Sequence, residues 1–307
     1  MNEVIFDKVC ILGIGLIGSS LARAIADRQL ANTIVISDSN SDTLSRAQEL
    51  ALGDIYETDA ATAVVNCDLV ILCVPVGVMG TVAESMKDGL KDGAIISDVG
   101  SVKESVVKAL LPHMPDHAHL IPAHPVAGTE KSGPDAGLKD LFIDRWTIVT
   151  PLENTDAMAL DKLTLFWQGL GSKVDVMEPK HHDLVLAITS HVPHLIAYNI
   201  VGTASDLEEV TKSEVIKYSA GGFRDFTRIA ASDPTMWRDV FLGNKDAVLE
   251  MLGRFSEDLT ALQRAIRWGD AEGLHNLFTR TREIRSRIID AGQDSDAVDF
   301  GRPHGEE

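Results

Sequence analysis

The chain has 307 residues, 45% of them hydrophobic and 24% charged, which is typical of a globular protein long enough for two domains with a core each. Its 46 acidic and 28 basic side chains give a net charge of −18 at pH 7. That charge argues against nucleic acid or an anionic membrane surface as a partner, because both select for faces rich in lysine and arginine.

Cys10, Cys67 and Cys73 lie inside apolar runs without CxxC spacing, so we interpret them as small buried hydrophobic residues and not as disulfide or zinc ligands. A reducing, cytoplasmic compartment is expected. The N-terminal sequence lacks the pattern of a secretory signal, and no apolar stretch is expected to approach the ~20 residues that span a bilayer.

The first predicted strand, Lys8 to Leu12, breaks into the glycine motif Gly13-Ile14-Gly15-Leu16-Ile17-Gly18, and an alanine-rich helix follows to about Arg28. In a strand–turn–helix of this kind, the three glycines allow a tight turn, approach of a pyrophosphate and close packing of helix on strand. The phosphates then lie at the helix N-terminus, where free N–H groups favour anions. The motif alone leaves open a purely structural glycine turn.

A second strand, Ile34 to Ser37, ends at Asp38, where a carboxylate can accept hydrogen bonds from the adenosine ribose of a dinucleotide. Asp38 would repel a 2′-phosphate, and the following Ser39 and Asn40 supply no arginine to bind one. This favours NAD over NADP. The alternative is an exposed turn aspartate without a ligand.

Three further strands alternate with helices: Leu69 to Val74, Ala94 to Ser97, and His119 to Ile121. The pattern predicts a Rossmann-type, doubly wound, mostly parallel α/β sheet, with ligands at the carboxyl ends of its strands. Val74 and Pro75, at one such end, are therefore predicted to contact the cofactor. Two more strands, Trp146 to Thr150 and Lys173 to Met177, are expected to flank a helix over 157–170.

His124 and Ser101 follow two of these strands. A histidine held where a buried strand opens into a loop suits a general base, although it could merely donate a hydrogen bond to that loop. Ser101-Val102-Lys103-Glu104 has the pattern of a capping box, so we favour a helix N-cap for Ser101 over a hydroxyl directed at the nicotinamide.

Helical patterns replace strand patterns after residue 178, so we predict a nucleotide-binding domain over 1–178, an all-helical domain over 179–292 and a disordered tail over 293–307. The first long helix, His181 to Ser205, is expected to be interrupted by Pro193. His191 and His194 lie on one of its faces. We favour core packing or substrate contact for them over a metal pair, because no further ligands are apparent.

The remaining helices combine charged and apolar residues. Ser232-Asp233-Pro234 is predicted to cap a helix that carries Trp237, and long helices are expected over 250–262 and 274–289. Taken singly, Arg224, Arg228, Trp237 and Arg238 are best explained by surface ion pairs and core packing. A helical domain this apolar commonly pairs with a second copy, so we expect a homodimer.

Together these segments resemble one family, the prephenate/arogenate dehydrogenases of tyrosine biosynthesis. The resemblance covers about residues 8 to 291. It rests on five motifs in order: Gly13-Ile14-Gly15-Leu16-Ile17-Gly18-Ser19, Asp98-Val99-Gly100-Ser101-Val102-Lys103, His124-Pro125-Val126-Ala127-Gly128-Thr129-Glu130, Ser190-His191-Val192-Pro193-His194 and Gly222-Phe223-Arg224-Asp225-Phe226-Thr227-Arg228. The glycine motif is shared by many dinucleotide enzymes, whereas the other four together are specific.

The resemblance implies an NAD-dependent oxidative decarboxylation that turns a cyclohexadiene ring aromatic. His124 matches the residue that accepts the proton of the ring hydroxyl, and Ser101 matches a serine that touches that hydroxyl and orients the nicotinamide. Arg228 matches an arginine that binds a substrate carboxylate, a task suited to a guanidinium. The other matching positions comprise the substrate-side residues His194, Trp237, Thr129 and Gly222 and the members of an ion network at the dimer interface, Glu130 and Asp225.

Two alternatives remain open. One is another two-domain reductase, acting on an imine or a β-hydroxy acid through a catalytic lysine, for which Lys180, Lys212 and Lys217 are available outside the matched motifs. The other is a non-catalytic NAD sensor, which would need the glycine motif and Asp38 but neither His124 nor Arg228. The resemblance does not separate prephenate from arogenate. Many members carry an added regulatory domain or a fused mutase; neither is expected here, so feedback by tyrosine would act at the active site.

Overall fold

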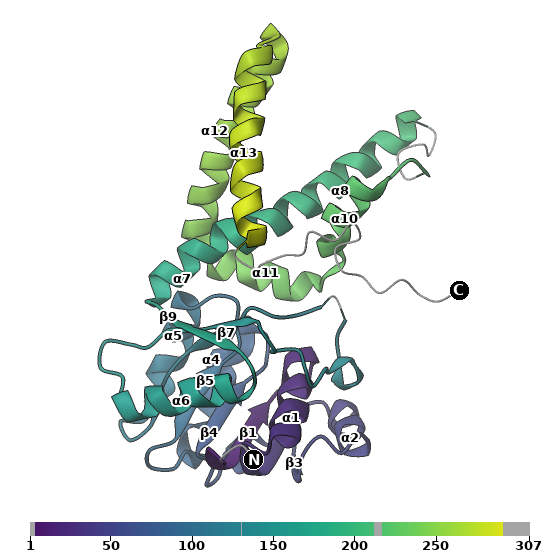
Figure 1. Cartoon of the computed structure of the whole chain (residues 1–307). Helices are drawn as coiled ribbons and strands as arrows, with labels where there is room; N and C mark the ends of the chain where they lie inside the picture. Colours follow the sequence, from purple (N-terminus) through teal and green to yellow (C-terminus); the bar gives the residue numbers. More distant parts are fainter. Residues whose placement is uncertain (1–3, 130, 212–216, 291–307) are drawn as a thin grey trace. The chain divides into compact units, whose positions relative to one another are not determined.

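A computed structural model describes residues 4–129, 131–211 and 217–290 (Figure 1). In this part of the chain the main sheet has six parallel strands in the order β3-β2-β1-β4-β5-β6. The strands are β1 (Phe6–Leu12), β2 (Ala31–Ser37), β3 (Ile55–Glu57), β4 (Leu69–Leu72), β5 (Ile95–Asp98) and β6 (His119–Leu120). The order reverses between β1 and β4, which is where a Rossmann sheet binds its ligand. The predicted fold class is confirmed.

Helices cover both faces of the main sheet: α1 (Leu16–Arg28), α2 (Ser41–Glu49), α3 (Ala60–Ala63), α4 (Met79–Met86), α5 (Glu104–Leu110) and α6 (Ala157–Gly169). Val9 and Ile11 of β1 pack in one core with side chains of α1, α2 and α6. Cys10 and Leu12, which alternate with them, pack in a second core with α3, α4 and α5. A strand buried on both faces explains why the sequence of β1 is apolar without alternation. Short 3₁₀ turns connect several elements: η1 (Val76–Val78), η2 (Lys87–Gly89), η3 (Leu111–His113) and η4 (Pro134–Ala136).

A second, three-stranded sheet contains His124. It consists of β7 (Ala123–Pro125), β8 (Trp146–Val149) and β9 (Lys173–Val176), with β7 antiparallel and β9 parallel to β8. The chain leaves the main sheet after Ile121, whose N–H donates to the Ile96 carbonyl, and joins the second sheet where the Pro122 carbonyl accepts from Thr150 N. His124 is therefore inside a strand of the second sheet, whereas the sequence placed it in the loop after a strand of the first.

The helical segment begins with α7 (Pro179–Leu186), a π-helical turn η5 (Ala187–His191) and α8 (Val192–Thr211). Pro193 does not interrupt this helix, because it falls in the turn after the wider π turn, where its missing N–H is tolerated. Next come α10 (Gly221–Thr227), η6 (Arg228–Ala231) and α11 (Pro234–Gly243). The predicted cap of α11 is confirmed, since the Asp233 side chain accepts from Met236 N at 2.7 Å.

One helix has the length and composition of a membrane span. Pro179–Asp206 has 28 residues and a mean hydropathy of 1.5 in its most apolar window, of which 28% is buried in the structure. The expectation that no apolar stretch approaches ~20 residues is therefore wrong. The same helix carries three buried polar side chains, His182, Asp183 and His191. Length and composition alone thus do not assign it to a membrane.

Packing divides the chain into two compact units, Met1–Leu249 and Glu250–Glu307. The first includes α11 because Trp237 and Val240 pack in the core that also contains Val102 and Val106. In the second unit, the predicted helices are confirmed and longer than expected. They belong to α12 (Lys245–Trp268) and α13 (Ala271–Asp290), which meet at a turn where Gly269 has φ +67°. The predicted tail over 293–307 lies outside the described residues.

Candidate active site

The three motif glycines have different surroundings. Gly13 has φ +95°, and a Cβ there would lie 2.7 Å from the Cys73 carbonyl oxygen. A Cβ at Gly18 would lie 2.1 Å from the Gly13 carbonyl oxygen, so neither position accepts a side chain. Around Gly15, no described heavy atom lies within 4 Å of the Cβ position. The fold requires two of the glycines, and the third leaves open space before the first turn of α1, formed by Leu16 and Ile17.

Asp38 is bound to the glycine loop. Its carboxylate accepts from Ile14 N at 3.0 Å and from Asn40 N at 2.9 Å. Val74 closes the other side, because its Cγ1 would lie 2.9 Å from a Cβ at Gly13, and the next residue, Pro75, is the N-cap of η1. A helix N-terminus without a side-chain cap at Gly15, an open approach and a carboxylate at the end of β2 fit the pyrophosphate and ribose of a dinucleotide.

The start of α5 differs from the sequence prediction. The helix begins at Glu104, with Lys103 as N-cap and no cap from a neighbouring side chain, so Ser101 does not form the predicted capping box. Instead the Asp183 carboxylate, from α7, accepts from Lys103 N at 2.7 Å and from Glu104 N at 2.9 Å. An anion that accepts two N–H groups stabilises a helix N-terminus better than a hydroxyl. Ser101 is left half-buried in the loop between β5 and α5.

A buried ion pair ties β5 to β7. Lys103 and Asp98 are both fully buried; the Lys103 ammonium donates to the Asp98 carboxylate and, at 2.7 Å, to the Ala123 carbonyl. Asp98 also accepts from Gly100 N at 2.7 Å and from Ala123 N at 3.2 Å. Burial raises the pKa of Asp98 and lowers that of Lys103, while their mutual attraction opposes both shifts. The residue before His124 is thereby fixed through both its N–H and its C=O.

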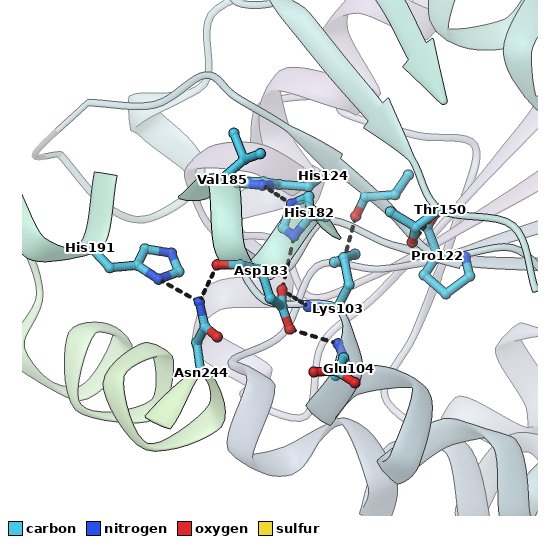
Figure 2. A network of polar contacts seen from close by, with 12 residues as sticks. Lys103, Glu104, Pro122, His124, Thr150, His182, Asp183, Val185, His191 and Asn244 are labelled. Atoms are coloured by element: carbon cyan, nitrogen blue, oxygen red, sulfur yellow. Dashed lines mark hydrogen bonds and ion pairs between the residues drawn. The ribbon is translucent and has the colours of Figure 1, made fainter. Parts of the chain in front are cut away.

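His124 is the first member of a chain of buried side chains shown in Figure 2. Its Nδ1 lies 2.8 Å from His182 Nε2, and His182 Nδ1 lies 2.9 Å from Asp183 Oδ1. Burial lowers the pKa of His124 well below 6.5, and the neighbouring His182, Lys103 and His191 lower it further. Burial, with Lys103 and His191, lowers the pKa of His182 to about 2. Both rings are therefore neutral at physiological pH.

Asn244 links this chain to His191 (Figure 2). Its Nδ2 donates to the Asp183 backbone carbonyl at 2.7 Å and to His191 Nδ1 at 3.1 Å. Burial lowers the pKa of His191 to about 4, although the Asp183 charge and the Ser101 carbonyl oppose the shift. Burial also raises the pKa of Asp183, against the two backbone N–H groups and Lys103. His191 is thus a buried core residue whose Nδ1 is hydrogen-bonded, while its Nε2 has no hydrogen-bond partner among the described residues.

His194 stacks on Trp237, with ring centroids 3.7 Å apart, and its Nδ1 donates to the Ser190 carbonyl at 2.8 Å. Burial lowers the pKa of His194, and the Arg228 charge lowers it further, which places Arg228 nearby. Trp237 is 6% exposed and also faces His191, at 6.1 Å between ring centroids. Within the described part of the chain, its Nε1 is buried without a hydrogen-bond partner. A buried donor without a partner indicates a site for a polar ligand.

Arg228 is exposed, and so are Thr129 and Gly222. The Thr129 hydroxyl accepts from Lys131 N at 3.2 Å. Gly222 lies on α10, where Arg224 Nε lies 3.7 Å from Asp225 Oδ1. Glu130 lies outside the described residues. Among residues 4–129, 131–211 and 217–290, no group of three histidine, cysteine, aspartate or glutamate side chains could hold a metal ion.

Two protein-family models match the chain. The family model described as prephenate dehydrogenase, nucleotide-binding domain, matches residues 21–176. The family model described as prephenate dehydrogenase, dimerization domain, matches residues 178–280. The chain belongs to the prephenate dehydrogenase family. It is an oxidoreductase of that family with an NAD-binding domain, as the sequence predicted.

Three relatives show how far the similarity extends. A cyclohexadienyl dehydrogenase of Zymomonas mobilis is 43% identical over 92% of this chain and 96% of its own length. A prephenate dehydrogenase of Bacillus subtilis is 32% identical over 94% of this chain and 77% of its own. The crystal structure of prephenate dehydrogenase from A. aeolicus, in complex with hydroxyphenyl propionate and NAD+, has a TM-score of 0.86 at 32% identity and covers 94% of this chain and 99% of its own.

Four buried residues of the site were not predicted from the sequence: Lys103, His182, Asp183 and Asn244. Lys103 belongs to the motif Asp98-Val99-Gly100-Ser101-Val102-Lys103, but the capping-box pattern there predicts a role for Ser101 and none for Lys103. His182 and Asp183 directly follow the charged start of a helix, where polar side chains usually face solvent. Only their neighbours Leu186 and Ala187, buried one turn further on, indicated that this face is turned inward.

Proposed function

We propose that this protein catalyses the NAD-dependent oxidative decarboxylation of prephenate, arogenate or both, giving 4-hydroxyphenylpyruvate or tyrosine. The observation that carries the proposal is a buried, neutral histidine, His124, in the same compact unit as the glycine crevice and the group formed by His194, Trp237 and Arg228. A neutral imidazole can take a proton at physiological pH, and the arginine supplies a positive charge to an anionic substrate.

In the proposed reaction, bound NAD supplies the acceptor for a hydride from the hydroxyl-bearing ring carbon. His124 takes the hydroxyl proton, so that this oxygen becomes a carbonyl as the hydride leaves. The bond from the ring to its carboxylate then breaks and carbon dioxide departs. The electron pair moves through the ring, which becomes aromatic, to the carbonyl oxygen, and this oxygen takes the proton back from His124 as the hydroxyl of the product. Since aromatisation drives the reaction, the side chains mainly position the substrate and accept its proton.

The remaining assignments divide between the two ends of the substrate. We assign Ser101 to the hydroxyl and the nicotinamide, Arg228 to a carboxylate, and His194 and Trp237 to the substrate side, with Thr129 and Gly222. The orphaned Trp237 Nε1 supports a polar ligand at this end. A chain of charge −18 can bind a dianion if a guanidinium faces a desolvated pocket, where its attraction is strongest. Glu130 and Asp225 are proposed to hold the arginine in an ion network.

We further propose a homodimer formed through the helical region, with residue 178 as the boundary of the nucleotide-binding domain. The two matched family models meet there, and the second is described as a dimerization domain. Large apolar side chains are more than half exposed along α12 and α13: Leu249, Leu259, Ile266, Trp268 and Phe278. A second copy would cover such surfaces.

The free thiols Cys10, Cys67 and Cys73 support the cytoplasm as the compartment.

The test is an assay of the purified protein with prephenate and with arogenate, each with NAD and with NADP, by the absorbance of the reduced cofactor. We expect turnover of at least one substrate with NAD preferred. Tight NADH binding without turnover of either substrate would favour a sensor. Turnover of a cyclic imine instead would favour the reductase alternative, and Lys180→Ala and Lys217→Ala would then locate its catalytic lysine.

A further inference from the structure

The hydrogen bonds around Asp183 fix which atoms carry protons. Lys103 N and Glu104 N can only donate, so both carboxylate oxygens of Asp183 act as acceptors, at 2.7 and 2.9 Å. His182 Nδ1 lies 2.9 Å from the oxygen that already accepts from Lys103 N. Because this oxygen is a hydrogen-bond acceptor, the nitrogen that lies next to it must be a donor. His182 therefore carries its proton on Nδ1.

The proton position on His182 in turn fixes the proton position on His124. His182 is neutral and protonated on Nδ1, so its Nε2 has a lone pair. At 2.8 Å from that nitrogen, His124 Nδ1 must donate. Because His124 is neutral as well, the ring nitrogen left with a lone pair is Nε2, on the opposite side of the ring from His182.

We propose that Asp183 and His182 are positioning residues that hold His124 in the tautomer whose Nε2 can accept the substrate proton. The inference rests on the proposed function, in which His124 is the base. Neither residue touches the substrate: Asp183 acts through His182, and His182 acts through His124. Lys103 and His191, the other titratable groups that face this chain, lie beside it without entering it.

The reverse proton positions, with a protonated Asp183, are disfavoured by the backbone N–H groups of Lys103 and Glu104. A protonated Asp183 could donate to His182 Nδ1, which would put the proton of His124 on Nε2 and remove the base. One carboxyl oxygen would then be a hydroxyl facing a backbone N–H, and the nearby Lys103 ammonium would lose an anionic partner. When His124 takes the substrate proton, its charge lies two hydrogen bonds from the carboxylate, and no proton has to move to Asp183.

His182 is the better residue to test, because Asp183 also caps α5. His182→Leu removes both ring nitrogens. His182→Gln offers an amide oxygen to His124 Nδ1 and an amide N–H to Asp183, so it preserves the direction of both hydrogen bonds. His181→Leu is the matched control, since His181 precedes His182 on the same helix but is exposed.

We expect His182→Leu to lower kcat at least ~10-fold with KM little changed, because the base is misoriented and the substrate contacts are not. His182→Gln should recover part of that loss, and His181→Leu should match the wild type. Nitrogen-15 NMR of the wild-type protein should show His124 protonated on Nδ1, and His182→Leu should shift the proton toward Nε2.

Three results would overturn the positioning role: a proton on His124 Nε2 in an active wild-type enzyme, an unchanged kcat in His182→Leu, or equal losses of kcat and stability in the Leu and Gln variants. The first two leave the proposed function standing. By contrast, a wild-type protein that turns over neither prephenate nor arogenate overturns the proposed function, and the positioning role with it.

Discussion

The nucleotide crevice and the histidine cluster solve different physical problems with different parts of the chain. The crevice is made of backbone: a glycine loop, the start of α1, and one carboxylate that accepts from that loop. The cluster is made of polar, mostly ionisable side chains from β7, α7 and η5 and from the residues that flank α5 and α11, and burial keeps its histidines neutral. Changes in the first region should therefore alter binding, whereas changes in the second should alter chemistry or folding.

His124→Asn should produce the largest effect on the chemistry. Loss of a general base lowers kcat by roughly 10² to 10⁴, and KM should change far less. Because burial lowers the pKa of His124, the base stays unprotonated as pH falls through ~6.5, and the acidic limb of the wild-type profile should lie below that value. The pH–rate profile of folded His124→Asn should lack that limb. A near-normal kcat, or a limb that persists unshifted, would identify another group as the base; His181→Asn is the control.

Lys103→Met should produce the largest effect on stability. It leaves the fully buried Asp98 without its cation, and breaking a buried pair costs ~3 to 5 kcal/mol. Denaturant unfolding should show this loss, and adding Asp98→Asn should restore part of it. Lys108→Met, at an exposed position of α5, should leave the free energy of unfolding unchanged. If Lys103→Met and Lys108→Met changed the free energy of unfolding equally, the buried pair of Lys103 and Asp98 would make no special contribution to stability.

Arg228→Ala separates binding from chemistry within the substrate region. A charge-assisted pair that becomes desolvated on binding is worth ~2 to 5 kcal/mol, so KM should rise at least ~10-fold while NAD binding stays intact. Steady-state kinetics with saturating NAD measure the change. Arg254→Ala, which removes an exposed i,i+4 pair with Glu250, is the control. A wild-type KM in Arg228→Ala would mean that this arginine is structural.

Gly15→Ala tests whether the crevice is a binding surface. Its Cβ meets no described atom within 4 Å, so Tm should stay unchanged, but the methyl group would occupy the approach of the pyrophosphate. We expect the Kd for NAD to rise roughly 10-fold, since a displaced pyrophosphate loses about 1.4 kcal/mol or more. Calorimetry measures both quantities. Gly18→Ala should lower Tm as well, and if Gly15→Ala did the same, the open space would be needed for folding and not for the cofactor.

Asp38→Ala should give the smallest effect. The variant loses the ribose hydrogen bonds and the repulsion of a 2′-phosphate, so the Kd for NAD should rise by several-fold, on the order of 1 kcal/mol, and the preference over NADP should narrow. The ratio of kcat/KM with NAD to kcat/KM with NADP measures this preference. Asp42→Ala, in the exposed first turn of α2, should leave that ratio at its wild-type value. Unchanged selectivity in Asp38→Ala would remove this residue from the cofactor site.

The difference between the nucleotide crevice and the histidine cluster also explains which parts of the site the sequence could predict. The glycine loop and Asp38 lie within one strand–helix–strand unit, so their spacing alone predicts their proximity, and the structure joins them through Ile14 N. His124 and His182 are 58 residues apart, and Lys103 and Asp183 are 80 apart, so no local pattern connects them. The family resemblance named His124 without its partners.

Two errors came from local sequence rules, one overridden by a distant residue and the other by an irregular turn next to the proline. Ser101 has the spacing of a capping box, but Asp183 offers the α5 N-terminus two charged acceptors, so the hydroxyl is displaced from that role. Pro193 predicted a break in the helix, but a π turn before it absorbs the missing hydrogen bond. The first correction required knowing that α7 meets the start of α5, and the second required knowing the local backbone geometry before Pro193.

The π turn at Ala187–His191 has a consequence for how this fold could diverge. One residue advances an α-helix by about 1.5 Å and rotates all that follows by about 100°. His182 and Asp183 lie before the turn, and His194, stacked on Trp237, lies after it. Loss of one residue from the turn would swing His194 away from Trp237 and displace His191, while His182 and Asp183 would keep their places. Insertions and deletions here, more readily than substitutions, would therefore reshape substrate choice while the proton-accepting half of the helix is inherited unchanged.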